Sequence, residues 1–406
     1  MKCFEKDDLQ ANSLGIIAMK RAVIIILDSV GVGAAADLAP EDNPRANTLL
    51  HVLQAATTPL PNLQRLGLGN ILPLPGLPVA QAPDAAWGRM APRSCGKDTT
   101  SGHWELAGLV LEHPLPTYPL GFPISLLEVF SAATGRGIIG NKVASGTAII
   151  AELGAEHMNN GAFIVYTSAD SVFQVAAHED VVSLPDLYAA CRKARALLQG
   201  EHGVGRVIAR PFLGEPGNFY RTGNRRDYSL PPPPGGLLAQ MRNAKLPVVA
   251  VGKINDIFAG QDISLSLPAH NNAESQSALL QALESTEQGL IFANYIDFDM
   301  LYGHRNDAPG YARALAAFDA GLPDILARMR EDDLLLITAD HGNDPTQPGT
   351  DHDRENVPLL ALGPRFSPCG LGLRESFADA GATVAAWLGV GDLPAGRSFL
   401  DMIHGL

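Results

Sequence analysis

The sequence predicts an α/β protein whose core is a central, mostly parallel sheet flanked by helices, with a smaller α/β domain inserted into it. Two observations predict this fold class. Several short apolar runs are continuous rather than alternating, which is typical of strands that are buried on both faces of a parallel sheet. The middle of the chain has separate strand and helix signals and ends in a proline-rich stretch, as an inserted domain would.

The length of the chain also favours two domains. It has 406 residues, of which 46% are hydrophobic, and single cores stop growing near about 250–300 residues. We place a leader at residues 1–19, the first part of the core at 20–112, an inserted cap domain at 113–231 and the second part of the core at 232–406. The leader is either a disordered tail or the product of an upstream start codon with Met19 as the true initiator. We favour the second interpretation, which the intact mass of the native protein would test.

Three of the apolar runs are followed directly by acidic residues. They are residues 22–27 before Asp28, residues 290–296 before Asp297 and Asp299, and residues 334–339 before Asp340. In open α/β sheets, ligands bind outside the carboxyl ends of the strands. The three runs are therefore predicted to deliver their acids to one shared site.

The remaining core elements follow from the same patterns. We expect strands at residues 247–252 and 357–362, and helices at residues 311–329 and 377–388. Pro323 falls inside the first of these helices and should kink or split it, because proline cannot donate the hydrogen bond that continues a helix.

The inserted segment has a strand signal at residues 163–167, another at residues 206–209 and a helix pattern at residues 185–198. It ends in Pro-Pro-Pro-Pro-Gly-Gly at residues 231–236, which cannot continue a helix or a central strand. We interpret this stretch as a linker back to the core.

Composition excludes several classes of function. The formal charge of −13 and the lack of basic runs make nucleic acid an unsuitable partner. No segment reaches the roughly 20 apolar residues of a membrane span. The four cysteines, at positions 3, 95, 191 and 369, show no paired spacing, which suits a reducing cytoplasm. The oligomeric state is left open. Any anionic substrate must be bound by a few cations focused in a cleft, together with metal charge.

Histidines accompany the strand-end acids. His304 follows Asp299, His341 follows Asp340, and His352 lies a short loop further on. Imidazole and carboxylate ligands together suit zinc, manganese or iron. A single aspartate after a strand is more simply interpreted as a turn or helix cap. It is the combination of acids and histidines that predicts metal, with enough ligands for two ions.

Two ions about 3.5–4 Å apart are suited to in-line displacement at phosphorus. Residues 96–105, GKDTTSGHWE, offer three hydroxyl groups between glycines. A hydroxyl is a poor nucleophile unless a base or a metal lowers its pKa, so a metal-bound Thr or Ser in this segment is chemically sensible. The segment could equally be a plain helix N-terminus with Asp98 or Thr99 as its cap.

Six segments together resemble one known family. They are LDSVG at 27–31, GKDTTSGHWE at 96–105, YTSADS at 166–171, GRVIARP at 205–211, DFDMLYGH at 297–304 and TADHGNDP at 338–345. In this order and spacing they resemble the phosphopentomutases of the alkaline phosphatase superfamily. The resemblance extends from about Arg21 to the C-terminus, and it implies an alkaline-phosphatase-like core with an inserted cap.

The resemblance also implies roles for individual residues. It implies two manganese ions (Mn2+) per chain, with a sugar bisphosphate as a candidate activator. The implied ligands are Asp28, Asp340 and His341 for one ion and Asp299, His304 and His352 for the other, with Thr99 between the ions as the residue that carries phosphate. The implied substrate residues are Ser168 and Asp170 facing the sugar, and Arg206, Arg221 and Lys253 receiving the distal phosphate. Taken singly, each basic residue could instead be a solvated surface charge.

The activity implied by the resemblance is the interconversion of ribose 1-phosphate and ribose 5-phosphate, or their 2-deoxy forms, through a phosphothreonine and a 1,5-bisphosphate, as in nucleoside catabolism. Two alternatives on the same core are a metal-dependent phosphatase and a cofactor-independent phosphoglycerate mutase. The latter would have a serine in an Asn-Ser-Glu setting, whereas this loop has Asp98-Thr99-Thr100. A third alternative is a non-catalytic sugar-phosphate-binding relative that has kept the ligands but lost turnover.

Overall fold

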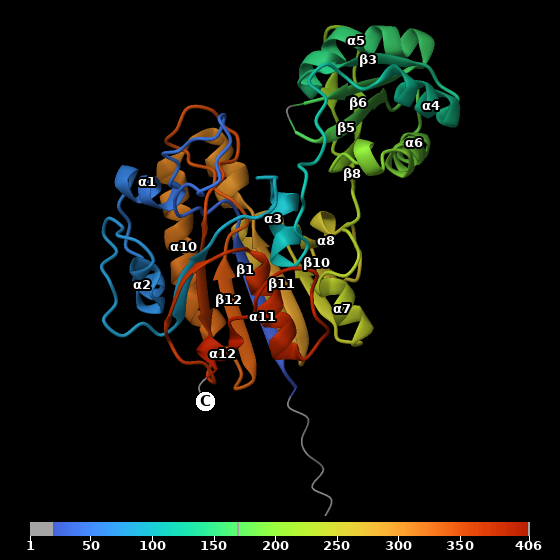
Figure 1. The fold of residues 1–406 in the computed structure, drawn as a ribbon. Helices are drawn as coiled ribbons and strands as arrows, with labels where there is room; N and C mark the ends of the chain where they lie inside the picture. The colour runs from blue at the N-terminus through green and yellow to red at the C-terminus, as the bar shows by residue number, and fades with distance from the viewer. Residues whose placement is uncertain (1–18, 169, 405–406) are drawn as a thin grey trace, which may run out of the picture.

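The computed structural model describes residues 19–168 and 170–404. The predicted leader lies outside these residues, except for Met19. The described chain forms two sheets with helices packed against them, and Figure 1 shows the smaller sheet with its helices at one end of the larger one.

The larger sheet has eight strands and is mostly parallel, as expected. Its order is β10 (Leu265–Leu267), β9 (Val248–Val251), β11 (Gly289–Tyr295), β1 (Arg21–Leu27), β12 (Asp333–Thr338), β13 (Val357–Leu362), β2 (Ala86–Met90) and β14 (Gly370–Arg374). Strand β13 is antiparallel to both of its neighbours. The central strands β1, β11 and β12 are buried along their whole length, which explains why their sequences are continuous apolar runs.

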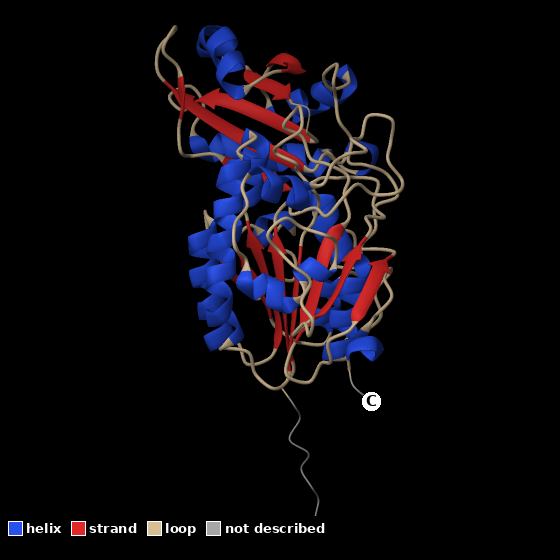
Figure 2. Cartoon of the chain, turned by 90° about the vertical axis from the view of Figure 1, so that its left-hand side faces the viewer, coloured by secondary structure: helices blue, strands red, loops and turns tan. Residues whose placement is uncertain are grey.

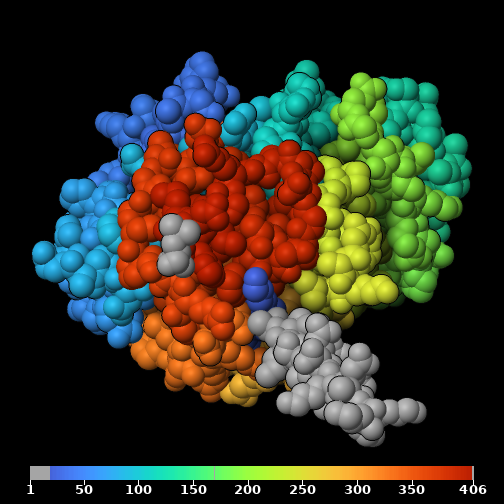
Figure 3. All heavy atoms as spheres, turned by 60° about the horizontal axis from the view of Figure 1, so that its bottom comes forward, coloured from blue at the N-terminus to red at the C-terminus, as the bar shows by residue number. Residues whose placement is uncertain are grey.

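Helices pack on both sides of this sheet, which Figure 2 shows between them. One group of helices in mutual contact consists of α1 (Thr48–Ala55), α2 (Pro61–Leu66), α9 (Asn272–Ser285) and α10 (Ala308–Leu326). Another group consists of α3 (Thr99–Leu106), α7 (Leu237–Asn243), α8 (Ile254–Ile257), α11 (Ala378–Leu388) and α12 (Leu400–Ile403). The lower end of the core, seen in Figure 3, is covered largely by C-terminal segments, with the start of β1 emerging beside them.

Helix α10 bears on one expectation. The sequence predicted that Pro323 would kink or split the helix; the helix is not split, because α10 continues through Pro323 to Leu326. Proline leaves the carbonyl four residues before it without its helical donor, and here that carbonyl belongs to Asp319. The side-chain amide of Asn62 on α2 donates to Asp319 O at 2.9 Å. The neighbouring helix therefore replaces the missing hydrogen bond, so the helix is not split.

The smaller sheet lies wholly within the predicted cap (residues 113–231). It contains β3 (Ile138–Val143), β4 (Phe163–Thr167), β5 (Val172–His178), β6 (Arg206–Leu213), β7 (Tyr220–Arg221) and β8 (Arg226–Ser229). Its helices are α4 (Ile124–Thr134), α5 (Gly146–Asn160) and α6 (Leu184–Leu197). The domain boundaries themselves remain a prediction.

The cap has a hydrophobic core on each face of its sheet. Alternate residues of β4 point to opposite faces: Phe163 and Val165 pack in the cluster under α4 and α6, while Ile164 and Tyr166 pack in the cluster under α5. The chain enters the cap after α3 and returns at α7. Leu237 N donates to Ala107 O at 2.8 Å, so both connections start from the C-terminal end of α3.

Candidate metal centre

Three neighbouring strands deliver acidic side chains to one edge of the larger sheet. Strands β11, β1 and β12 are adjacent and parallel. Asp28 follows β1 directly, Asp340 follows β12, and Asp299 lies in a π-helical turn, Phe298–Tyr302, after β11. A π-helical turn is rare and is found mostly at functional sites. All three carboxylates are buried.

The first group of candidate ligands is Asp299, His304 and His352. The Nε2 atoms of the two histidines lie 3.2 Å apart. Asp299 Oδ2 is 3.1 Å from His304 Nε2, and Asp299 Oδ1 is 3.3 Å from His352 Nε2. One atom from each of the three residues can therefore reach a common ion. This is the set that the resemblance assigned to one metal.

The second group is centred on His341. Its Nε2 atom lies 3.4 Å from both Asp28 Oδ1 and Asp340 Oδ2. Asp28, His341 and Asp299 also have ligand atoms close enough to share an ion, so Asp299 faces both groups. The rings of His341 and His352 stack with centroids 3.9 Å apart. All six residues predicted as metal ligands therefore lie together.

Backbone carbonyls orient two of the histidines. Nδ1 of His304 lies 2.5 Å from Thr350 O, and Nδ1 of His341 lies 3.0 Å from Gly342 O. A carbonyl can only accept, so each Nδ1 carries the hydrogen and each Nε2 presents a lone pair when the ring is neutral. This arrangement is usual around histidines that bind metal.

The charges in the centre shift its pKa values strongly. Burial lowers the pKa of His341, but Asp340 and then Asp28 outweigh it and raise the pKa to about 10. Burial raises the pKa of Asp299, but hydrogen bonds from His304 and His352 hold it well below its usual value. The ionised form of Asp299 is thus favoured, as a metal ligand requires.

The side chains of this centre are suited to hold a divalent cation. Asp28 Oδ1 and Asp340 Oδ2 are buried and have no hydrogen-bond partner among the residues that the structure describes. A buried charged oxygen without a partner is rare in native proteins, and both of these face His341 Nε2. A bound ion would satisfy both oxygens.

Thr99 lies beside this centre. It is the first residue of α3, and the Asp98 side chain caps the helix by accepting from Ser101 N at 3.1 Å. Thr99 Oγ1 lies 3.2 Å from His341 Nε2. The two interpretations of this segment are therefore compatible: Asp98 is a helix cap, and the cap presents Thr99 to the metal centre.

Gly102 lets α3 approach β12 closely. A Cβ atom at this position would lie 2.8 Å from Asp340 C, 2.9 Å from Asp340 Cβ and closer still to the carbonyl oxygen. Only a residue without a side chain allows this contact. The glycine therefore fixes how near Thr99 lies to the metal ligands.

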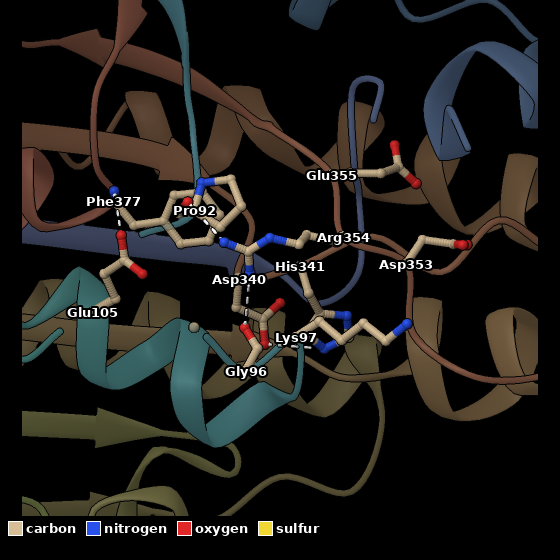
Figure 4. Close-up of a pocket in the computed structure, with 11 residues that line it drawn as sticks. Pro92, Gly96, Lys97, Glu105, Asp340, His341, Asp353, Arg354, Glu355 and Phe377 are labelled. Atoms are coloured by element: carbon tan, nitrogen blue, oxygen red, sulfur yellow. Dashed lines mark hydrogen bonds and ion pairs between the residues drawn. The ribbon is translucent and has the colours of Figure 1, made fainter. Parts of the chain in front are cut away.

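Arg354 holds the loop that leads into α3. Its Nη1 donates to Ser94 O at 2.8 Å and its Nη2 to Pro92 O at 3.2 Å. The same guanidinium forms an ion pair with Asp37 at 2.8 Å. Figure 4 shows Arg354 reaching across the small pocket that also contains His341 and Lys97. The loop before Thr99 is thus tied to the segment that carries His352.

Three of the predicted substrate residues lie together in the cap. Asp170 N donates to Ser168 Oγ at 3.3 Å, and Arg206 lies 3.8 Å from Asp170 Oδ2. Arg206 begins β6 and pairs in register with Ser229 of β8. Strand β8 contacts α8, which begins directly after Lys253. Arg206 and Lys253 therefore both lie near the junction of the cap and the core.

Arg221 lies further along the cap. It pairs with Phe212, which is six residues from Arg206 on the same strand, or roughly 20 Å at the usual rise per residue. Between them lies Arg210, whose Nε donates to Gln174 Oε1 at 3.0 Å. Arg206, Arg210 and Phe212 share one face of β6, so Arg210 lies on the same face of the strand as Arg206 and as the partner of Arg221.

Several residues of the centre were not assigned from the sequence. Arg210 could have been found, because its spacing from Arg206 places both on one face of a strand. Arg354, His103 and Asn294 carry no such signal. Their roles depend on contacts between segments far apart in the chain, which spacing does not reveal.

Comparison with known proteins identifies the class first. Residues 20–392 match the model of the metalloenzyme superfamily, and the chain belongs to it. Divalent-metal binding is therefore a property of this protein, in agreement with its clustered ligands.

Relatives narrow the assignment. The chain is 54% identical over 385 residues to a phosphopentomutase from Caldanaerobacter subterraneus subsp. tengcongensis, covering 94% of this chain and 98% of the relative. It is 54% identical over 391 residues to a phosphopentomutase from Symbiobacterium thermophilum, covering 95% and 99%. It is 52% identical over 388 residues to one from Dictyoglomus turgidum, covering 95% and 98%. The chain belongs to the phosphopentomutase family and is an isomerase, as the sequence resemblance implied.

Proposed function

We propose that the chain interconverts ribose 1-phosphate and ribose 5-phosphate, or their 2-deoxy forms, through a phosphothreonine at Thr99 and a pentose 1,5-bisphosphate. The observation that carries the proposal is the position of Thr99 Oγ1, 3.2 Å from Nε2 of His341, one of the clustered candidate ligands. Membership of the family supports the substrate class.

We propose two manganese ions per chain for this centre. Asp28, Asp340 and His341 would hold one, and the triad containing Asp299 would hold the other. Bound there, divalent ions would neutralise the charge on the transferring phosphoryl group and on the attacking and leaving oxygens. The ligand types also suit zinc or iron, so manganese rests on the family resemblance.

Thr99 performs the transfer in two steps. Phosphorylated Oγ1 gives its phosphoryl group to the free hydroxyl of a bound pentose monophosphate. The proton of that hydroxyl passes to Oγ1, which leaves Thr99 as a free alcohol. The bisphosphate then returns its other phosphoryl group to Oγ1 and leaves as the isomeric monophosphate. The N-terminus of α3 adds partial positive charge at the position where the phosphate is carried.

The cap residues bind and shield the sugar phosphate. Ser168 and Asp170 would face the sugar, while Arg206, Arg221 and Lys253 would bind the phosphate that is not reacting. Arginine suits this role because its guanidinium pairs with phosphate oxygens in two places at once. By covering the site the cap would exclude water, which otherwise hydrolyses the phosphothreonine. That exclusion separates a mutase from a phosphatase.

An isomerisation assay tests the proposal. The enzyme, loaded with manganese and primed with a sugar bisphosphate, is incubated with ribose 5-phosphate, and ribose 1-phosphate and free phosphate are both measured. We expect ribose 1-phosphate in excess over free phosphate, and no reaction with 3-phosphoglycerate. Release of free phosphate without ribose 1-phosphate would overturn the mutase assignment in favour of a phosphatase.

The other expectations also stand as proposals. The partners are small pentose phosphates rather than nucleic acid, in keeping with the charge of −13. A cytoplasmic location agrees with the free cysteines at positions 95, 191 and 369. None of the helices in residues 19–404 that the structure describes could span a bilayer.

A further inference from the structure

Two fully buried polar side chains lie behind the metal centre and have no part in the proposed reaction. His103 is on α3, four residues after Thr99, and Asn294 is near the end of β11, where it pairs with Ile26 of β1. Both have no exposed surface. Buried polar groups of this kind are costly unless they are fully hydrogen-bonded, so their partners matter.

His103 contacts both the nucleophile and a metal ligand. Its Nδ1 atom lies 2.9 Å from the backbone oxygen of Thr99 and 3.0 Å from Asp340 Oδ2. Both of these atoms can only accept, so Nδ1 carries the hydrogen, which points at Thr99 O. The ring also stacks on Phe292 of β11, with centroids 5.9 Å apart. The imidazole is thus fixed in place, with the lone pair on Nε2.

Asn294 continues this chain of contacts to the other carboxylate. Its Nδ2 atom lies 3.3 Å from His103 Nε2 and 3.1 Å from Asp28 Oδ2. An amide nitrogen carries two hydrogens, one for each of these acceptors. A continuous chain of polar contacts therefore runs from Thr99 and Asp340 through His103 and Asn294 to Asp28.

The two oxygens of each carboxylate have different surroundings. Asp28 Oδ2 accepts from Asn294, and Asp340 Oδ1 accepts from Ser29 N at 3.1 Å. The remaining oxygens, Asp28 Oδ1 and Asp340 Oδ2, accept no hydrogen bond in the described part of the chain; Asp340 Oδ2 lies 3.0 Å from His103 Nδ1, whose hydrogen points at Thr99 O. Each lies 3.4 Å from His341 Nε2. One oxygen of each carboxylate is anchored and the other points at the metal centre.

We propose that His103 and Asn294 are positioning residues for the metal bound by Asp28, Asp340 and His341. Through these contacts they hold the two carboxylates so that Asp28 Oδ1 and Asp340 Oδ2 face the metal position. They also fix the backbone of Thr99 next to the same two carboxylates. This inference rests on the proposed assignment of these ligands. Such partners of ligands change metal affinity by about 10–100-fold when they are removed.

A purely structural role makes a different prediction. If the two side chains only fill the core, their loss should lower stability and weaken both metal positions to a similar extent. Neither His103 nor Asn294 forms a hydrogen bond, ion pair or ring contact with the triad of Asp299, His304 and His352, so the triad serves as an internal reference.

The experiment measures manganese binding to the metal-free full-length protein, by the paramagnetic resonance signal of free Mn2+. The variants are His103→Leu and Asn294→Leu, which remove the polar contacts but fill the space. Each is also made with His352→Gln, so that the remaining isotherm reports the position formed by Asp28, Asp340 and His341 alone. The melting temperature of every metal-free variant is recorded.

His157→Leu is the matched control. His157 is a fully buried histidine in the cap, with Nδ1 at 2.5 Å from Ala162 O and Nε2 accepting from His178 N at 2.9 Å. Its replacement should lower the melting temperature by a similar amount without changing manganese affinity. The conservative variant His103→Asn restores a donor near Nδ1 and should recover part of the lost affinity.

We expect His103→Leu and Asn294→Leu to weaken manganese binding by about 10–100-fold at the position formed by Asp28, Asp340 and His341, and by less than threefold at the position formed by Asp299, His304 and His352. Equal weakening at both positions, or less than threefold weakening at the position formed by Asp28, Asp340 and His341, would overturn the inference. The proposed function is tested by a different result. If the wild-type protein binds two ions but forms no ribose 1-phosphate, the mutase activity is refuted while the positioning role of His103 and Asn294 still stands.

Discussion

Gly102→Ala should slow the enzyme by moving Thr99, the proposed nucleophile, without removing any reacting group. A methyl group at this position would lie under 3.0 Å from three atoms of Asp340, two of them in the backbone. Atoms in a packed core do not overlap in this way. Helix α3 must therefore shift away from β12 by roughly 1 Å.

The expected cost can be worked out from this displacement. A misplacement of about 1 Å at the reacting atoms can reduce a rate by about 100-fold, which corresponds to about 2.7 kcal/mol in the activation free energy. Overpacking costs about 1–3 kcal/mol of stability, and replacing glycine by alanine in a helix returns about 1 kcal/mol. The variant should thus stay folded while its kcat falls.

The assay is ribose 1-phosphate formation at saturating substrate and manganese, with the melting temperature measured in parallel. Gly137→Ala in the cap is the control, because its methyl group would meet Ala162 Cβ at an ordinary 3.4 Å. We expect kcat to fall by about 100-fold in Gly102→Ala and by less than twofold in the control. If Gly102→Ala keeps kcat within twofold of the wild type, the close approach of α3 does not set the position of Thr99.

Thr99→Val, which keeps the shape of the side chain, should abolish both turnover and the mass increase of the phosphoenzyme while two manganese ions still bind; any remaining phosphoenzyme would mean that another residue is the nucleophile. Manganese affinity should rise by about tenfold per pH unit below pH 10, since His341, whose pKa its neighbouring carboxylates raise to about 10 against the effect of burial, must lose its proton to bind metal. In metal-free protein, protonated His341 stabilises the folded state fully below its unfolded pKa of about 6.5, and this stabilisation is lost as the pH rises toward 10. The melting temperature should therefore fall over this pH range, and a constant melting temperature would contradict the raised pKa. Arg21→Met should cost about 3–5 kcal/mol in unfolding free energy, because it leaves Asp333 buried and unpaired; the double variant with Asp333→Leu should recover most of the loss in a denaturant titration, and no recovery would mean that the ion pair is not the cause.

The central strands were predictable from the sequence because their burial on both faces produces unbroken apolar runs. β1, β11 and β12 were each located to within a residue or two. The strands at the edge of the sheet were not found. β14, for example, has only one buried residue among its five, so it lacks the signal that marked the centre.

The clustering of the candidate metal ligands was predictable for the same reason that the strands were. Asp28, Asp299 and Asp340 follow apolar runs, and parallel neighbours bring their ends together. Asn294 could not be found this way, because it lies inside a buried run and an amide there has no distinctive spacing. Its partner His103 belongs to the segment GKDTTSGHWE at residues 96–105, yet only the packing of α3 against β11 reveals what it contacts.

The hydrogen bond from Leu237 N to Ala107 O has a consequence for how the protein can be altered. The points at which the chain leaves and rejoins the core are adjacent, and none of the described residues between 113 and 231 belongs to a strand of the larger sheet. The cap is thus an insertion that leaves the larger sheet complete. It can be exchanged or removed at a single place in the chain without changing the order of the strands in that sheet. Proteins built on this plan can acquire new chemistry by changing the cover over the reacting groups while the groups themselves stay the same.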